Sequence, residues 1–349
     1  MPKTRHYIRR LFARSTPFAS LVALLATLLA CGATASAVAA VPDPGSRPGS
    51  GSPSGSGSGA DPGASRSAVP DPSPGPGAGL RSGSGGGPRG SGSELRSGDP
   101  REQGAKVFNG QGFDTCVAPS LDTMQAWKES SPFGAVGVYF GGRGRSCPEQ
   151  PNLDRDWVSQ VHGMGWRILP LYVGSQAPCV IAEQKRQFAM GDEDPAQQGA
   201  REGRDAVARA RELGMSKHSA LYLDMEAYEI GDSQCADTTL EFVQGWDRAV
   251  HAAGYLPGFY SNAGSGITHM ENAREAGSGD LPEMMWFARW GVTPSVRYEQ
   301  SLSPDAWQPH RRIHQYDGDV TREYGGYRLR IDRNLVDAPV ATFAAAGGS

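Results

Sequence analysis

The stretch ALYLDMEAY, residues 220–228, contains the pattern that decides the fold and the expected site. It is an apolar, strand-like run that is interrupted by two acids, Asp224 and Glu226. Side chains in a β-strand alternate between two faces, so both carboxyl groups are expected on one face. Leu223 and Met225 should then point to the opposite face. The stretch therefore predicts a strand with an acidic face near its carboxyl end.

Seven further segments after Gln111 have the same short, apolar character. They are GFDTC (112–116), AVGVYFGG (135–142), RILPLYVG (167–174), LPGFYSN (256–262), MWFARW (285–290), RIHQYDGD (312–319) and LRIDRNLV (329–336). Amphipathic stretches with helix caps and glycine stops follow the earlier strands, and this strand-then-helix order predicts a parallel sheet. Eight strands predict closure of the sheet. Because little helical sequence separates the last three strands, we expect an α/β fold: an irregular TIM-type (β/α) barrel, about five βα units followed by three strands.

The first 105 residues differ from this pattern. Residues 1–39 combine five basic residues, the apolar run LVALLATLLA and a small-residue segment, which is the layout of a signal peptide. The apolar run is too short to span a bilayer, so no transmembrane segment is expected in the mature chain. Residues 40–105 are rich in Gly, Ser and Pro and predict a disordered linker. The folded domain is therefore expected at 106–345.

The signal allows more than one export route. The pair Arg9-Arg10 in IRRLFA resembles a twin-arginine export signal, although such pairs also occur in ordinary signals. The segment LLAC also resembles a lipobox, which would anchor the chain by a lipid on Cys31. Simple secretion is favoured over the lipid anchor. Either route predicts a protein that is secreted or associated with the cell wall.

The net charge argues against one class of function, and the cysteine count predicts disulfides. The predicted signal carries five of the basic residues, so its removal takes the formal charge from −3 to −8. A mildly acidic exported chain is not typical of a nucleic-acid-binding protein. An even number of cysteines then predicts two disulfides among the remaining four. These cysteines are Cys116, Cys147, Cys179 and Cys235.

Polar residues lie at corresponding positions of other predicted strands. They are Asp114 at the end of the first strand, Gln315 and Tyr316 at the end of the seventh, and Asp332 and Asn334 in the eighth. The first and eighth strands are neighbours in a closed barrel, so Asp114 and Asp332 should approach each other at its mouth. An Asp at a strand end more often caps a loop, which is the alternative for each of them taken alone.

Two neighbouring acids at a barrel mouth suit glycoside hydrolysis. A carboxyl in partly apolar surroundings has a raised pKa and can donate a proton, while its neighbour stays ionised. We expect Glu226 to be the donor and Asp224 to be the ionised neighbour. The alternative is that the two acids bind a metal or pair with an arginine such as Arg289 or Arg333. No histidine lies near these acids at ligand spacing, so no metal and no cofactor is expected.

Aromatic side chains on the same strands are candidate platforms for sugar rings. They are Tyr139, Tyr172, Tyr260, Trp290 and Tyr316. An aromatic residue on a strand is more often part of the core, so each of these assignments has a structural alternative.

The series GFDTC, LYLDME, GFYSN, MWFARW, HQYDGD and IDRNLVD, in that order, resembles the family 25 glycoside hydrolases. These are secreted lysozymes that cut peptidoglycan between N-acetylmuramic acid and N-acetylglucosamine. VGVYFGG, ILPLYVGSQ and YLDMEAY resemble more closely a glycoside-hydrolase-like domain, domain of unknown function 1906, of exported bacterial proteins. The resemblance covers residues 110–343 and implies five βα units followed by three strands. It also implies that Glu226 is the proton donor and that Asp114, Asp224 and Asp332 are site acids.

Two hypotheses follow. The first is a secreted glycoside-hydrolase-like protein that acts on peptidoglycan or another extracellular glycan, with Glu226 as general acid. The second is a non-catalytic module of the same fold that binds cell-wall glycan or regulates its turnover. The sequence does not decide between them, and a monomer is expected for both.

The barrel order also selects one cysteine pairing. The four cysteines follow strands one to four in turn, and adjacent parallel strands bring their C-terminal loops together. We therefore expect Cys116 to pair with Cys147 and Cys179 to pair with Cys235. Both bridges would brace loops around the proposed site.

Overall fold

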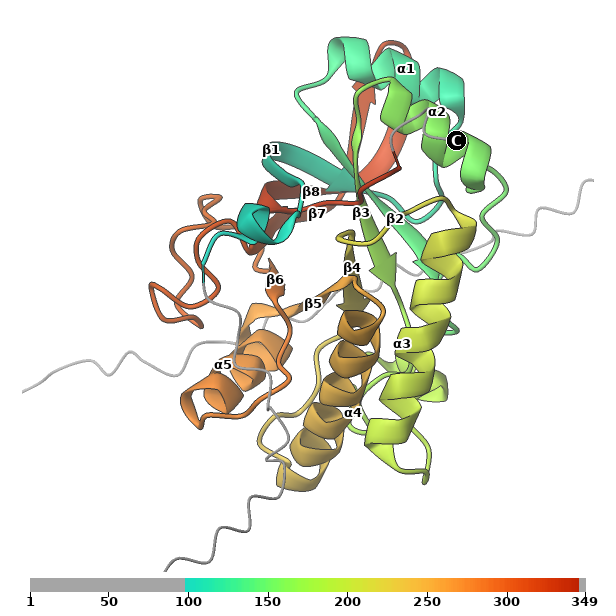
Figure 1. Ribbon diagram of the computed structural model, residues 1–349. Coiled ribbons are helices and arrows are strands. Elements are labelled where there is room, and N and C mark those ends of the chain that lie inside the picture. The colour runs from blue at the N-terminus through green and yellow to red at the C-terminus, as the bar shows by residue number, and fades with distance from the viewer. Residues whose placement is uncertain (1–97, 345–349) are drawn as a thin grey trace, which may run out of the picture. The chain divides into compact units, whose positions relative to one another are not determined.

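The barrel expected from the sequence is present in a computed structural model, which describes residues 98–344. The strands are β1 (Val107–Asp114), β2 (Ala135–Gly141), β3 (Arg167–Tyr172), β4 (Ala220–Asp224), β5 (Leu256–Asn262), β6 (Met284–Ala288), β7 (Arg312–Tyr324) and β8 (Tyr327–Pro339). They form one closed barrel in chain order (Figure 1). The α/β barrel class is confirmed. The predicted signal peptide and residues 40–97 of the predicted linker lie outside the described residues.

Five α-helices follow the first five strands. They are α1 (Leu121–Ser130), α2 (Arg155–Gly163), α3 (Pro195–Glu212), α4 (Ser233–Ala252) and α5 (Thr268–Glu275). The described residues also contain the short helical segments η1 (Pro100–Gln103), η2 (Glu183–Phe188) and the π-helical η3 (Ala263–Ile267). Side chains cap the helices as the sequence indicates, and Ser120 accepts from the Thr123 amide at the start of α1. The sequence pattern places the start of α4 at 237 or 238, but Asp232 caps it earlier by accepting from the Cys235 amide.

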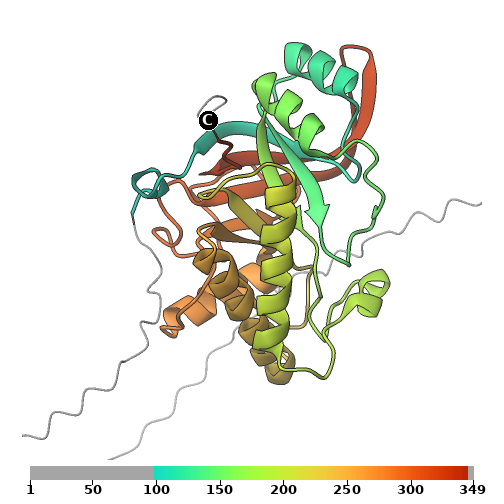
Figure 2. The same cartoon turned by 45° about the vertical axis from the view of Figure 1, so that its right-hand side comes forward.

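The side of the barrel that the sequence predicts to be irregular contains a reversed strand, which the sequence does not predict. Strands β1 to β7 pair in parallel, whereas β8 is antiparallel to both of its neighbours, β7 and β1. The reversal is made by Gly325 and Gly326, whose φ angles of 56° and 82° suit a two-residue hairpin turn. The β7–β8 hairpin extends beside α1, as Figure 2 shows, and Trp127 donates to the Tyr327 carbonyl there.

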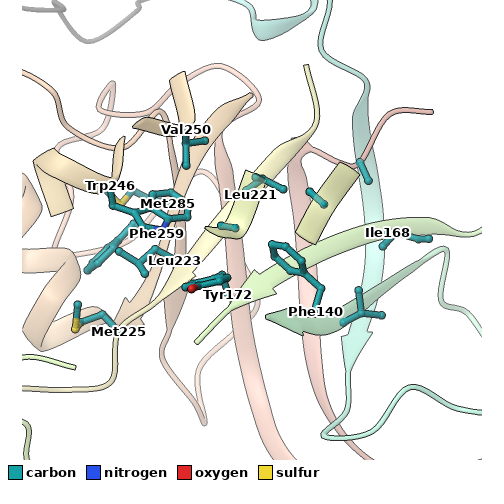
Figure 3. Packing of buried hydrophobic residues seen from close by; sticks show 14 of the residues in the cluster. Phe140, Ile168, Tyr172, Leu221, Leu223, Met225, Trp246, Val250, Phe259 and Met285 are labelled. Atoms are coloured by element: carbon teal, nitrogen blue, oxygen red, sulfur yellow. The ribbon is translucent and has the colours of Figure 1, made fainter. Parts of the chain in front are cut away.

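Two apolar layers hold the barrel together. Inside it, Leu169, Tyr222 and Trp286 pack with other inward-facing residues. Outside it, alternate residues of the same strands pack under the helices (Figure 3). Leu223 and Met225 belong to this outer layer, which confirms the expected alternation around Asp224.

Helices α3 and α4 pack closely because glycines form their contact. A Cβ atom at Gly199 would overlap the carbonyl oxygen of Phe242, and one at Gly245 would overlap that of Ala196. The backbones therefore touch where side chains would normally separate them. This contact fixes α4 against α3.

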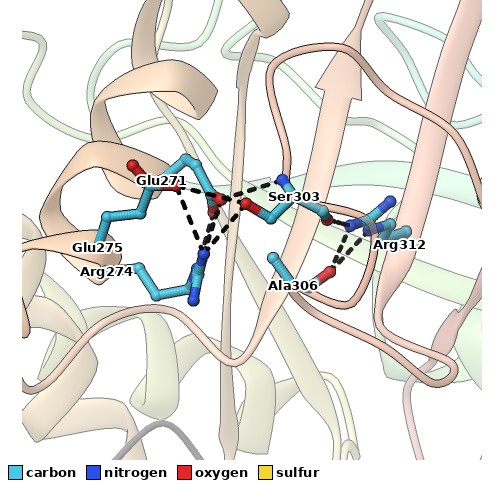
Figure 4. A network of polar contacts seen from close by, with 6 residues as sticks. All are labelled: Glu271, Arg274, Glu275, Ser303, Ala306 and Arg312. Atoms are coloured by element: carbon cyan, nitrogen blue, oxygen red, sulfur yellow. Dashed lines mark hydrogen bonds and ion pairs between the residues drawn. The ribbon is translucent and has the colours of Figure 1, made fainter.

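The long connection between β6 and β7 is ordered by charged groups rather than by a helix. Figure 4 shows that Glu271 of α5 accepts from Arg274 and from the Ser303 amide. Arg312, which is buried, donates to the carbonyls of Ser303 and Ala306. These contacts hold the loop that begins with Trp290 at the end of β6.

Folded structure begins inside the segment that the sequence assigns to the linker. Asp99 caps η1, and the carbonyl of Gly98 accepts from Arg311. Pro100 and Ala105 are buried. The Gly-, Ser- and Pro-rich composition of the segment hides this short element, because only two apolar residues are needed to pack it against the domain. Within residues 98–344, no helix is long and apolar enough to cross a membrane.

The glycine contact between α3 and α4 leads to a stability prediction. Gly245→Ala should lower the free energy of unfolding by about 1–3 kcal/mol, because the added methyl group forces the two backbones apart. The control is Gly163→Ala at the end of α2, where no other described atom lies within 4 Å of the new Cβ. That substitution should raise stability by about 0.5–1 kcal/mol, since alanine favours the helix. Urea unfolding measures both, and equal effects would contradict the packing described.

Candidate functional site

The acids predicted from separate strands meet at one end of the barrel. The carboxyl ends of β1 to β7 lie at this end, which we call the mouth. Because β8 runs in the opposite direction, Asp332 in the middle of β8 pairs directly with Asp114 at the end of β1. The approach of these two residues is therefore as predicted, although the reversal of β8 was not.

Asp114 is held in a buried hydrogen-bond network. It is 1% exposed, and its carboxylate accepts from the Tyr139 hydroxyl at 2.7 Å and from the Asn334 amide at 2.8 Å. Trp286 donates to the Asn334 Oδ1 at 2.8 Å, which fixes the orientation of that amide. Gly137 of β2 leaves room for the carboxylate, since a Cβ there would lie 2.5 Å from the Asp114 Cβ.

Gln315 links this network to the rest of the mouth. Its amide nitrogen donates to Asp114 at 3.3 Å and to Asp332 at 3.4 Å. Its amide oxygen accepts from the Tyr260 hydroxyl at 3.0 Å and from the Trp290 indole at 3.1 Å. One buried side chain thus connects β1, β5, β7, β8 and the rim after β6.

Asp224 and Glu226 lie at the end of β4, and they occupy different surroundings. Asp224 is 4% exposed, and its Oδ1 is buried without a hydrogen-bond partner among residues 98–344. The Glu226 side chain is 34% exposed, and its Oε1 lies 3.3 Å from the Nζ of Lys185. The more accessible acid is therefore the one that has a cation beside it.

Two residues that the sequence analysis missed organise this pair. The Gln176 side chain donates to the Asp224 carbonyl at 3.0 Å and accepts from the Glu226 amide at 2.9 Å. Lys185, in η2, is 5% exposed and also donates to the Gly144 carbonyl. Gln176 lies in the segment LPLYVGSQ, directly after β3, where a polar residue at a strand end is a usable signal. Lys185 lies in a loop without periodicity, and nothing in its sequence context marks it.

Burial and mutual repulsion raise the pKa values of the mouth carboxyls. Burial raises the pKa of Asp224 well above its usual range, the charges of Glu226 and Asp114 add to this, and Lys185 opposes it. Burial and the charge of Asp114 raise the pKa of Asp332 to about 7. Burial also raises the pKa of Asp114, against three hydrogen bonds that lower it. The expectation of an ionised Asp224 is therefore corrected, because burial without a partner favours its neutral form.

The pKa of Tyr260 shows that the charges of the four acids converge at the mouth. Its pKa is raised by burial and then by the charges of Glu226, Asp224, Asp114 and Asp332. Tyr139 behaves similarly, with burial followed by the charges of Asp114 and Asp224. Both hydroxyls therefore stay protonated and donate hydrogen bonds within the mouth.

The aromatic candidates divide into two groups. Tyr139, Tyr260 and Trp290 lie at the mouth, and Trp290 is 49% exposed at its rim. Tyr172 faces outward instead, where its hydroxyl donates to Asp205 of α3 and its ring lies in the layer under the helices. Its placement at the mouth is corrected, because the strand alternation puts Leu171 inside. Tyr316 also faces outward, under the Arg333 guanidinium.

The cysteines pair as the barrel order predicts. Cys116 bonds to Cys147, and Cys179 bonds to Cys235. The second bridge ties the loop that carries Gln176 and Lys185 to the first turn of α4. Within the described part of the chain, no group of three or more His, Cys, Asp and Glu side chains is placed to hold a metal ion.

The sequence model of the Rv2525c-like, glycoside hydrolase-like domain matches residues 125–336. The chain belongs to this family. The resemblance to a glycoside-hydrolase-like domain is thereby confirmed, and the matched region includes β2 to β7 and the site residues of β4, β7 and β8. No curated protein matches the chain.

Several solved structures resemble the chain at low identity. An uncharacterised protein of B. stearothermophilus is 20% identical with a TM-score of 0.41, and the match covers 65% of this chain and 95% of that one. The Mycobacterium tuberculosis Tat-secreted protein Rv2525c, in complex with L-tartrate, is 16% identical with a TM-score of 0.43, and the match covers 66% and 96%. The catalytic domain of the endolysin ply40 from Listeria monocytogenes bacteriophage P40 is 15% identical with a TM-score of 0.40, and the match covers 66% and 93%. Likenesses at this level carry no functional argument.

The raised pKa of Asp332 predicts a pH-dependent stability. The folded carboxyl holds its proton up to about pH 7, whereas an unfolded Asp ionises near pH 4. Folding therefore takes up a proton between these values, and the contribution of Asp332 to stability falls as the pH rises through this window. Asp332→Asn should remove that fall and gain about 1–4 kcal/mol on the wild type between pH 4 and pH 8.

Urea unfolding at several pH values measures this difference. Glu241→Gln, at an exposed position of α4, is the control and should keep the wild-type slope. Parallel wild-type and Asp332→Asn curves would show that Asp332 ionises normally in the folded state.

Proposed function

We propose that the domain is an exported hydrolase of peptidoglycan or a related cell-wall glycan, with its site at the mouth of the barrel. The observation that supports this most strongly is the unequal pair at the end of β4. Asp224 is buried without a partner, whereas Glu226 is accessible and lies beside Lys185. Glycoside hydrolysis needs two carboxyl groups that differ in this way.

The pair supplies one proton and one negative charge. In the free protein, burial raises the pKa of Asp224 and retains its proton, while the Nζ of Lys185 lies 3.3 Å from Glu226 Oε1. When a sugar enters, the proton passes to Glu226 through solvent at the mouth, and Glu226 donates it to the glycosidic oxygen as the bond breaks. Asp224, now ionised, stabilises the positive charge that develops at the anomeric carbon. Water then adds its oxygen to the anomeric carbon and gives a proton to Glu226, which is deprotonated after the first step.

The remaining groups orient the sugar. Asp114 and Asp332 are linked through Gln315, and the amide of Asn334 is fixed by Trp286. Tyr139 and Tyr260 place their hydroxyl groups beside these acids. Trp290, half exposed at the rim, offers a face to a sugar ring.

Export belongs to the same proposal. The two disulfides fit an oxidising compartment, and the signal-like segment 1–39 precedes the domain. Secretion by a twin-arginine route fits the pair Arg9-Arg10, while an anchor on Cys31 is the alternative end point.

The catalytic proposal predicts the effect of one substitution. Glu226→Gln should lower the release of reducing ends from purified peptidoglycan by about 10²–10⁴-fold, because the amide cannot donate the proton. The control is Glu229→Gln, an exposed glutamate three residues further on, which should keep wild-type activity. Equal release from wild type and Glu226→Gln would remove Glu226 from this role.

A binding module is the second candidate, and the ion pair favours it. Lys185 engages the same carboxyl that would have to be protonated for catalysis. In this case the domain should sediment with insoluble cell wall and release no reducing ends. Glu226→Gln should then leave the bound fraction unchanged.

The export route predicts a further outcome in cells. Arg9→Lys combined with Arg10→Lys should retain the precursor inside the cell if the twin-arginine route is used, because that route requires the arginine pair. Normal export of the doubly substituted chain would assign it to the general route. N-terminal sequencing of the exported protein distinguishes cleavage after Ala39 from processing at Cys31.

A further inference from the structure

A cavity lies on the outer face of the barrel, close to the mouth. Its volume is about 520 Å³, and we call it the outer pocket. It is lined by Gln111 of β1, Tyr316 and Asp317 of β7, Arg333 and Leu335 of β8, and by loop residues between 291 and 294. None of the proposed mouth acids lines it, so it is distinct from the site described above.

Arg333 is the polar group that gives the outer pocket its character. Its guanidinium lies over the Tyr316 ring, 4.9 Å from the centroid, and its Nη1 lies 3.4 Å from Asp317 Oδ2. Its Nε is buried and has no hydrogen-bond partner among residues 98–344. A buried donor without an acceptor is costly. The rest of the Arg333 side chain is partly exposed and lines the outer pocket, where a ligand can reach it.

The charge balance at the outer pocket favours an anion. Asp317 is the one acid among its lining residues, and it is shared with Arg322, which lies 3.6 Å away. Two guanidinium groups therefore face one carboxylate. A guanidinium binds a carboxylate ligand through charge-assisted N–H donors, and the guanidinium of Arg333 lines the outer pocket. Val292 and Pro294 add an apolar wall beside it.

The outer pocket and the mouth are built from the same strand segments. Along β7, Gln315 points into the mouth and Tyr316 points into the outer pocket. Along β8, Asp332 and Asn334 face the mouth and Arg333 between them faces outward. Trp290 connects the two sites over the rim.

The connection through Trp290 is direct. Its indole donates to Gln315 at the mouth, and the next residue, Gly291, lines the outer pocket and donates to the Tyr316 carbonyl. A polymer that lies across the exposed Trp290 ring would place one unit at the mouth. It would present a substituent of the next unit to the outer pocket.

We propose that the outer pocket binds a carboxylate-bearing substituent of the glycan whose neighbouring sugar occupies the mouth. This inference rests on the proposed function for the identity of the polymer. The substituent that fits has a carboxylate for Arg333 and a small apolar group for Val292 and Leu335. The lactyl ether of N-acetylmuramic acid has both where the stem peptide has been removed, because its carboxyl group is otherwise amide-bonded to that peptide. N-acetylglucosamine has no lactyl ether.

The test compares the methyl glycosides of these two sugars by NMR titration of the domain. The Nε–H resonance of Arg333 is the direct reporter, because its partner-free state changes when a carboxylate binds. The muramic derivative should shift this resonance and the Gly291 and Val292 amides, whereas the glucosamine derivative should leave them in place. Similar shifts for both sugars, or none at Arg333, would overturn the proposal.

Substitutions of Arg333 test whether binding depends on its charge or on the planar geometry of its guanidinium. Arg333→Gln should weaken binding of the muramic derivative at least tenfold, and Arg333→Lys should restore part of it, since the charge returns without the planar fork. Arg328→Gln is the matched control, because Arg328 is exposed on the same strand and pairs with Glu323. An unchanged affinity in Arg333→Gln would overturn the proposal. A spectrum that keeps the wild-type dispersion shows that each variant is folded.

The two proposals fail in distinguishable ways. Binding of the muramic derivative that depends on Arg333, together with no release of reducing ends from peptidoglycan, would support the outer pocket and remove the hydrolase. Hydrolysis that depends on Glu226, with no Arg333-dependent binding, would keep the hydrolase and remove the outer pocket.

Discussion

The antiparallel placement of β8 between β7 and β1 is the constraint on which the rest of the structure depends. It closes the barrel, and it sets Asp332 directly opposite Asp114. It also brings the Asn334 amide within 2.8 Å of the Asp114 carboxylate, so the seam of the barrel and the centre of the site are one network. A change that disrupts the closure of the barrel at β8 would therefore also disrupt the geometry of the site.

The mouth contains more buried carboxyl groups than a fold selected only for stability would have. Asp114 has three side-chain donors, but the Asp224 Oδ1 has none within the described residues. A buried carboxyl oxygen without a partner is costly, and this cost falls at the end of β4, where it contributes no hydrogen bond to the described structure. Lys185 forms its ion pair with Glu226, and its charge only partly opposes the effect of burial on Asp224. Such unequal treatment of neighbouring acids is characteristic of reactive sites.

The sequence predicts much of this arrangement because alternation in a strand is strict. Asp224 inward with Leu223 and Met225 outward follows from the period of two, and the disulfides follow from the order of the strands. The direction of β8 does not follow, since an inward-facing pattern is the same in either direction. Tyr172 was misplaced because alternation does not say which face of β3 is inward, and the structure places Leu169 and Leu171 there. Lys185 and Gln176 act from a loop whose path depends on tertiary contacts.

The loop that carries Lys185 and Gln176 is tethered to α4 by the bridge between Cys179 and Cys235. This tether couples the geometry of the acidic pair to the thiol chemistry of the surroundings. A chain with free thiols would hold Glu226 less firmly than an oxidised one. The arrangement of the acidic pair therefore depends on whether the surroundings of the chain are oxidising or reducing.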